Sequence, residues 1–329
     1  MKLLQSGLGE GRRWFRTEIE ASLGWLSWAR GDFDRACREM EAAVTVGMAE
    51  EQPEIDAVRF VPDEPIGAVL VHLAWGRLVQ GDLTGAEVEL ARAARWIERL
   101  DFPQGPFMHD YALFMDCWMC IESGQLERAA VVSAEMIEQA ERHDFDLWRL
   151  IAATQRTSVK ALASLAADDL DPAELSAHIE ALTGLLDTWH TIELNLYRTF
   201  FDGVLSRLLT AAGQPKQARA RLDEALQLAQ DTGMHFYDAE LLRLRARTHT
   251  DPDARRGDVN AALELARQQG ATLFELRAAV DDFELRGEQA RAVLRDAVER
   301  MRVDGAWPEL ARARAALEFT SRAAGGIDK

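Results

Sequence analysis

Two cysteines separated by two residues, Cys117 and Cys120, are a pair of side chains whose types and spacing could do chemistry. Such a pair occurs in redox motifs and supplies half of a structural zinc site. A structural zinc site needs four ligands, and the sequence has no second cysteine pair and no nearby His-x-x-x-His partner. Since a free cysteine behaves as a small apolar residue, we interpret the pair as buried and inert. We predict no metal site and no cofactor.

The histidines and carboxylates do not form a catalytic pattern either. A catalytic site needs a nucleophile, a base and a residue that orients the base. The seven histidines are scattered along the chain, and the many carboxylates are explained by solvated helix faces. We therefore predict no catalytic residues and no enzymatic activity. The histidines are His72, His109, His143, His178, His190, His235 and His249.

A short recurring unit indicates the elements that must position these side chains. It consists of a Gly, then Asp or Gln, then an apolar residue or Pro, with an Ala five positions after the Gly. The unit begins at Gly31, Gly81, Gly124 and Gly213, at spacings of 50, 43 and 89 residues. A period of roughly 45 residues is typical of helical solenoids. Gly can end one helix in a left-handed conformation, and the next residue can cap the following helix, so each unit predicts a helical hairpin.

The hairpins are predicted along the whole chain. We call the first helix of each hairpin its A helix and the second its B helix. No clean turn signature marks the fourth hairpin, but Pro172 suits the first turn of a helix there. We predict one solenoid over residues 1–329, with a C-terminal capping helix over 306–325. The predicted pairs are 12–30 with 33–50, 66–80 with 83–99, 107–123 with 126–142, 146–166 with 172–188, 191–212 with 215–232, 236–249 with 256–269, and 272–285 with 288–303.

The residues within the hairpins resemble the tetratricopeptide repeat (TPR). The first unit matches its Leu-Gly pair at Leu23 and Gly24, its turn at 31–33, and its two small B-helix positions at Ala36 and Ala43. At these positions the two helices approach so closely that only small side chains fit. The resemblance implies an all-α fold, a right-handed α-α superhelix of TPR-like hairpins.

The C-terminal third resembles a narrower family. Residues 236–245, 261–271, 274–279 and 305–314 are similar to segments in the helical repeat region of large bacterial signal-transduction ATPases. In that family the region accompanies an ATPase module and either a class III nucleotide cyclase or a LuxR-type DNA-binding domain. The sequence has no Gly-x-x-x-x-Gly-Lys-Ser/Thr phosphate loop, so the ATPase module is missing. The resemblance implies a bacterial regulatory repeat region, either stand-alone or excised.

The charge balance bears on partners and location. The formal net charge is -17, from 55 acidic and 38 basic residues. Nucleic-acid binding depends on a basic surface, so we expect no direct DNA or RNA binding. The acidity is explained either by a solvated surface or by a groove that prefers a cationic peptide. Because no long apolar run or signal peptide is evident, we expect a cytoplasmic protein without a membrane span.

A column of aromatic residues is the candidate binding site. In the TPR register, Trp25, Trp75 and Trp118 follow the Leu-Gly position in three successive units, on the A-helix face that lines the concave groove of that family. Tryptophan offers a large apolar area with one hydrogen-bond donor, which suits a ligand platform. The alternative is that these residues fill the space between adjacent A helices. The predicted groove residues are Trp25, Trp28, Val71, Trp75, Tyr111, Phe114 and Trp118.

Two functions remain open from the sequence. The first is a non-catalytic regulatory or interaction module that binds a protein, peptide or small molecule in the groove. The second is a structural oligomerisation module, such as a homodimer, with no groove ligand. The longest connector, residues 51–65, contains three prolines, and long loops are often functional. We hypothesise that it folds over the groove or contacts a neighbouring chain.

Overall fold

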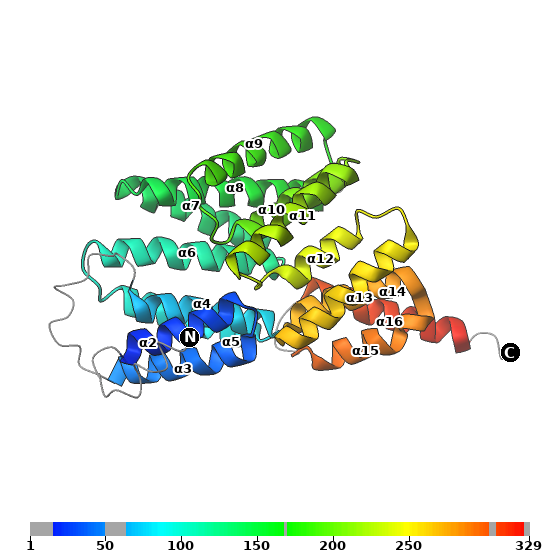
Figure 1. Cartoon of the computed structure of the whole chain (residues 1–329), viewed down its shortest axis with the longest axis horizontal. Helices are drawn as coiled ribbons and strands as arrows, with labels where there is room; N and C mark the ends of the chain where they lie inside the picture. The colour runs from blue at the N-terminus through cyan, green and yellow to red at the C-terminus, as the bar shows by residue number, and fades with distance from the viewer. Residues whose placement is uncertain (1–15, 50–63, 168–169, 303–306, 326–329) are drawn as a thin grey trace. The chain divides into compact units, whose positions relative to one another are not determined.

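The computed structural model describes residues 16–49, 64–167, 170–302 and 307–325, and all regular structure in these ranges is helical (Figure 1). The all-α fold class is therefore confirmed. The chain divides into two compact units, residues 1–78 with 83–156 and residues 79–82 with 157–329. The predicted single solenoid stays a prediction. Residues 12–15 of the first predicted helix and residues 51–63 of the long connector lie outside the described residues.

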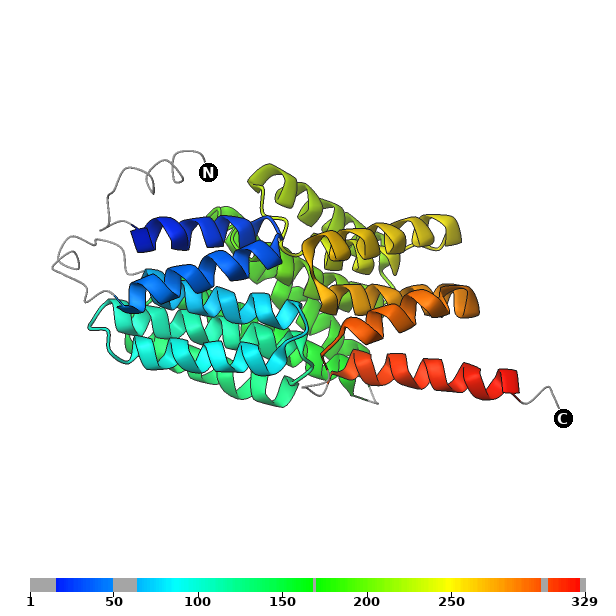
Figure 2. The same cartoon turned by 90° about the horizontal axis from the view of Figure 1, so that it is seen from below.

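The first unit contains three complete hairpins and the start of a fourth. Helices α2 to α7 lie side by side in Figure 2, from blue to cyan. The bounds of the pairs agree with the predicted ones to within a few residues. They are α2 (Arg16–Ala29) with α3 (Phe33–Ala49), α4 (Pro65–Val79) with α5 (Leu83–Ile97), and α6 (Gln104–Glu122) with α7 (Leu126–Arg142), followed by α8 (Asp146–Ala166), within which the unit boundary falls.

The second unit continues the alternation of A and B helices. Its first complete helix begins at Pro172 as predicted, and the Asp171 carboxylate caps it by accepting a 2.8 Å hydrogen bond from the amide of Ala173. The helices are α9 (Pro172–Thr191), α10 (Arg198–Ala211), α11 (Pro215–Thr232), α12 (Asp238–Ala246), α13 (Pro252–Gln269), α14 (Thr272–Arg286), the short 3-10 helix η3 (Gly287–Ala290), α15 (Arg291–Arg300) and the predicted terminal helix α16 (Pro308–Gly325).

The predicted glycine turns are present. Gly31, Gly81, Gly124 and Gly213 have φ angles of 76°, 82°, 77° and 71°, the left-handed region that a side chain disfavours. After Gly31, the amide of Asp32 donates to the carbonyl of Ser27 at 3.0 Å, which satisfies a carbonyl at the helix end. The amides of residues 125 and 214 make the equivalent bonds at 2.8 and 2.9 Å.

Two further turns have the same geometry without glycine. Asp144 and Glu193 have φ angles of 55° and 56°. The amides that follow them donate to Ala140 and Trp189 at 3.0 and 2.9 Å. These two turns lie before and after the fourth hairpin, and each follows a B helix.

The small residues at the predicted crossing of the first hairpin are required by its packing. A Cβ added to Gly24 on α2 would lie 2.7 Å from the Met40 side chain on α3, closer than atoms in contact allow. Ala36 and Ala43 on α3 are fully buried. The register taken from the sequence is therefore correct in this hairpin.

The turn at Glu193 predicts a stabilising substitution. Its side chain is exposed, and a left-handed conformation costs a residue with a Cβ about 1–2 kcal/mol, so we expect Glu193→Gly to raise the free energy of unfolding by about 0.5–1 kcal/mol. Glu180→Gly, at an exposed position inside α9, should lower it by about 1 kcal/mol. Urea denaturation measures both. Equal losses in the two variants would show that residue 193 is not strained.

Candidate functional site

The structure brings the seven predicted groove residues together on α2, α4 and α6, but it buries six of them. Only Trp25 is half-exposed. The other six are buried between A helices, an arrangement that agrees with the packing alternative, and their part in ligand binding stays a prediction. Ligand binding at Trp25 stays a prediction. The exposed fractions are 0% for Trp28, Val71, Trp75 and Trp118, 1% for Phe114 and 8% for Tyr111.

The buried tryptophans link three consecutive A helices. The ring centroids of Trp28 and Trp75 are 5.2 Å apart with an interplanar angle of 70°. Those of Trp75 and Trp118 are 4.8 Å apart at 45°. Tilted and edge-to-face arrangements at these distances are favourable between aromatic rings. The aromatic column therefore holds α2, α4 and α6 together.

His72 on α4 is the polar member of this aromatic cluster. Its Nδ1 lies 2.7 Å from the Ala68 carbonyl, which can only accept, so Nδ1 donates. Its Nε2 lies 3.2 Å from the Tyr111 hydroxyl and accepts from it. The ring also meets Trp28 edge-on at 4.7 Å. Burial lowers the pKa of His72 to about 4, so the imidazole is neutral near neutral pH.

A cavity of about 600 Å³ lies beside this cluster, between α2 and α4. We call it the first cavity. Its volume is in the range of ligand pockets, and most of its lining is apolar. Trp25 and His72 both line it, so it is the place where the predicted aromatic column reaches a space that a ligand could fill. The lining residues are Glu18, Ala21, Ser22, Trp25, Leu26, Met40, Pro65, Ala68, Val69 and His72.

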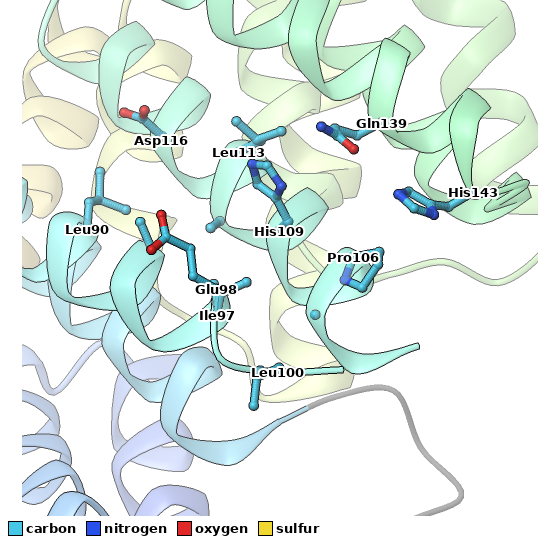
Figure 3. A pocket seen from close by; sticks show the side chains of 13 residues that line it. Leu90, Ile97, Glu98, Leu100, Pro106, His109, Leu113, Asp116, Gln139 and His143 are labelled. Atoms are coloured by element: carbon cyan, nitrogen blue, oxygen red, sulfur yellow. The ribbon is translucent and has the colours of Figure 1, made fainter. Parts of the chain in front are cut away.

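A second cavity of about 330 Å³ lies between α5, α6 and α7. Figure 3 shows Glu98, just after α5, and His109 of α6 on one side of it, and Gln139 of α7 and His143 at the end of that helix on the other. No motif in the sequence indicated this site. The spacing of seven residues could have shown that His109 and Asp116 share one face of α6. It could not have shown which helices lie opposite that face. The lining residues are Leu90, Ala94, Ile97, Glu98, Leu100, Gly105, Pro106, His109, Ala112, Leu113, Asp116, Gln139 and His143.

Ion pairs connect α6 and α7 at the wall of the second cavity. The Arg128 guanidinium donates to both carboxylate oxygens of Asp116, at 2.7 and 3.0 Å. Burial raises the pKa of Asp116, and Arg128 opposes that rise. His109 Nε2 lies 3.7 Å from the Glu135 carboxylate. Asp116 is therefore satisfied within the protein.

The cysteine pair is part of the core, as predicted. Cys117 and Cys120 are 0% and 1% exposed, and the Cys117 thiol lies 3.6 Å from the Ala129 carbonyl of the B helix α7. Burial raises the pKa of Cys120 to about 12 and that of Cys117 well above its usual value, so neither thiol is poised to ionise. Within the residues that the structure describes, no group of three or more His, Cys, Asp or Glu side chains could hold a metal ion.

Buried ion pairs link the A helices of the second unit. Arg243 on α12 donates to Glu240 on its own helix at 2.6 Å and to Asp281 on α14 at 2.8 Å. Arg277 on α14 pairs with Glu309 on α16 at 2.8 Å. Burial alone would raise the pKa of Glu240. The charges of Arg243 and Arg277 outweigh burial and lower this pKa to about 2. Segments 236–245 and 274–279, which resemble the repeat region of signal-transduction ATPases, therefore contribute to internal packing.

Asp110 on α6 is a buried carboxyl group of a different kind. It is 0% exposed, and neither of its oxygens has a hydrogen-bond partner among the described residues. Burial raises its pKa from 3.8 to about 7. An ionised carboxylate without a partner is costly in an apolar interior, so the protonated form is favoured.

The comparisons with known proteins bear on the fold. No family model matches the sequence, and no curated protein matches it. Among solved structures, the crystal structure of the apo form of RapI is similar, with a TM-score of 0.50 and 12% sequence identity. The match covers 92% of this chain and 99% of that one. At this identity the likeness shows a shared helical-repeat fold. No helix of the described ranges combines the length and apolar character needed to cross a membrane.

Asp110 predicts a pH dependence of stability. The pKa of Asp110 is higher in the folded state than in the unfolded state. Below about pH 4 the group therefore does not lower the free energy of unfolding, and its destabilising effect grows until the pH passes about 7. We expect the free energy of unfolding of the wild type to fall, relative to Asp110→Asn, as the pH rises from about 4 to about 7. Urea denaturation at several pH values measures this difference, in which the opposite contribution of His72 cancels. A difference that is constant with pH would contradict the assignment.

Proposed function

We propose that this chain is a non-catalytic regulatory or interaction module of a bacterial signalling or transcription-regulatory system. It binds a protein, peptide or small ligand in the first cavity. The observation that carries the proposal is this cavity of about 600 Å³, with the half-exposed Trp25 in its lining. Two observations support a regulatory role: the helical-repeat fold, and the resemblance of the C-terminal segments to the repeat region of signal-transduction ATPases.

The chemistry of the first cavity favours an apolar group on the ligand. Trp25, Leu26, Met40 and Val69 give it apolar walls. His72 contributes a neutral ring, both of whose nitrogens are hydrogen-bonded within the protein. Binding is then driven mainly by the burial of apolar area, which contributes about 25 cal/mol per Å² before the costs of association. A peptide with an aliphatic or aromatic side chain fits this site.

Binding here would act on the packing of the repeats. The same helices that form the cavity carry Trp28 and Trp75, which connect α2 to α4. If α2 and α4 can adopt two spacings, a ligand that binds one of them more tightly increases the fraction of molecules with that spacing. The size of the increase is set by the difference between the ligand's affinities for the two spacings. An effector that contacts the same unit would sense that shift.

The first cavity is tested by filling it. Ser22→Trp introduces a large side chain at an exposed lining position, and Ala91→Trp introduces the same side chain at an exposed position of α5 outside both cavities. Peptides selected from a random library against the wild type are titrated calorimetrically into each variant. We expect at least about tenfold weaker binding to Ser22→Trp, or about 1.4 kcal/mol, and unchanged binding to Ala91→Trp.

The alternative, an oligomerisation module with an empty groove, gives a different outcome. Light scattering would then show a concentration-dependent dimer, and no selected peptide would distinguish Ser22→Trp from Ala91→Trp. That result would contradict the proposed ligand site.

A further inference from the structure

We propose that the second cavity, between α5, α6 and α7, is a docking site for a basic segment of a partner protein, which inserts a Lys or Arg side chain. This site is separate from the first cavity and shares no lining residue with it. The proposal depends on a carboxylate without a partner, on the size of the cavity and on exposed apolar side chains around it.

Glu98 supplies the charge that a cation would meet. Its carboxylate lines the cavity and makes no ion pair or side-chain hydrogen bond with any described residue. Asp116 and Glu135 add negative charge nearby, and Arg128 neutralises part of it through Asp116. Arg142 also reaches the lining, where it donates to the Gln139 side chain at 3.3 Å, on the side of the cavity away from Glu98. A guanidinium or ammonium group entering the cavity therefore finds an available acceptor in Glu98. A hydrogen bond between two charged groups is about twice as strong as a neutral one.

The cavity has the dimensions and the walls for a long basic side chain. Its volume is about 330 Å³, and Leu90, Ile97 and Leu113 line it beside the polar groups. Lys and Arg place an apolar stem against such walls while the charged end reaches a polar partner. Figure 3 shows the Glu98 carboxylate pointing away from Leu100, toward the side of the cavity where Leu90 and Asp116 lie.

Exposed apolar side chains around the cavity favour a polypeptide over a small cation. Phe102 is 71% exposed, and its ring lies 6.4 Å from that of His143, a lining residue. Val131 is 68% exposed on α7, on the same helix stripe as Arg128, Glu135 and Gln139. A peptide that places its cation in the cavity can cover both side chains with its own apolar groups.

Matched variants test the site with the full chain. Ala94→Trp fills the second cavity, whereas Ala91→Trp lies one turn earlier on the same helix and outside the lining. Glu98→Gln removes the free carboxylate, whereas Glu138→Gln removes an exposed carboxylate of α7 that does not line the cavity. Both charge variants change the net charge equally, so non-specific attraction of cations to an acidic protein affects them alike. The probe is a random peptide library selected on the wild type, followed by calorimetric titration of the selected peptides.

We expect a class of selected peptides that contain Arg or Lys and bind Ala94→Trp and Glu98→Gln at least about tenfold more weakly than the wild type. The same peptides should bind Ala91→Trp, Glu138→Gln and Ser22→Trp within about twofold of the wild type, and Phe102→Ala about threefold more weakly, because it removes exposed apolar area that the peptide would cover. The absence of such a class, or equal losses in Glu98→Gln and Glu138→Gln, would overturn the proposal. So would equally tight binding of free ethylguanidine, because the site would then take small cations. Peptides lost only in Ser22→Trp would support the first cavity and not the second.

Discussion

The left-handed glycine that follows α2, α4, α6 and α10 is the constraint on which the rest of the structure depends. It lets the chain reverse within two or three residues, because the following amide can then bond back to the last turn of the helix. The reversal sets the A and B helices so close that Gly24, Ala36 and Ala43 must be small. With one face of each A helix occupied by its B helix, the large side chains on the other face pack against the next A helix. Trp28, Trp75 and Trp118 follow from that geometry.

The sequence predicted this architecture well because the turn and the crossing impose local requirements on residue type. Glycine at a positive φ and alanine at a tight contact are visible in a single sequence. Asp144 and Glu193 were missed because a residue with a Cβ can also adopt the left-handed conformation at a tolerable cost, and nothing in its type announces it. The cysteine pair was interpreted correctly as buried, since cysteines without further ligands behave as small apolar residues. The helices at 146–166 and 172–188 were predicted from weak Asp and Pro turn signals at 168–172, and the second of them ends three residues later than predicted, at Thr191.

The candidate sites were less predictable, because both depend on distances between helices. The TPR register aligned the seven groove residues correctly along three helices, but it does not give the spacing of those helices. The spacing decides that Trp75 is enclosed between Trp28 and Trp118 while Trp25 remains half-exposed. A cavity is a volume that side chains fail to fill, and thirteen residues from three helices and the turns beside them line the second one. No pattern within a single helix encodes such a volume.

The distribution of charge separates the kinds of recognition available to each surface. In the interior of the first unit, the pKa values of His72 and Asp110 shift in opposite directions, yet burial favours the neutral form of both. A ligand beside His72 therefore meets a neutral, hydrogen-bonded ring and is selected by apolar area and shape. In the second unit, the carboxylate of Glu240 is already matched by arginines. Glu98 differs from both cases, because its carboxylate faces a cavity and makes no ion pair with any described residue. In the proposed docking site, selectivity for a cationic group would therefore come from the α5–α7 side of the first unit.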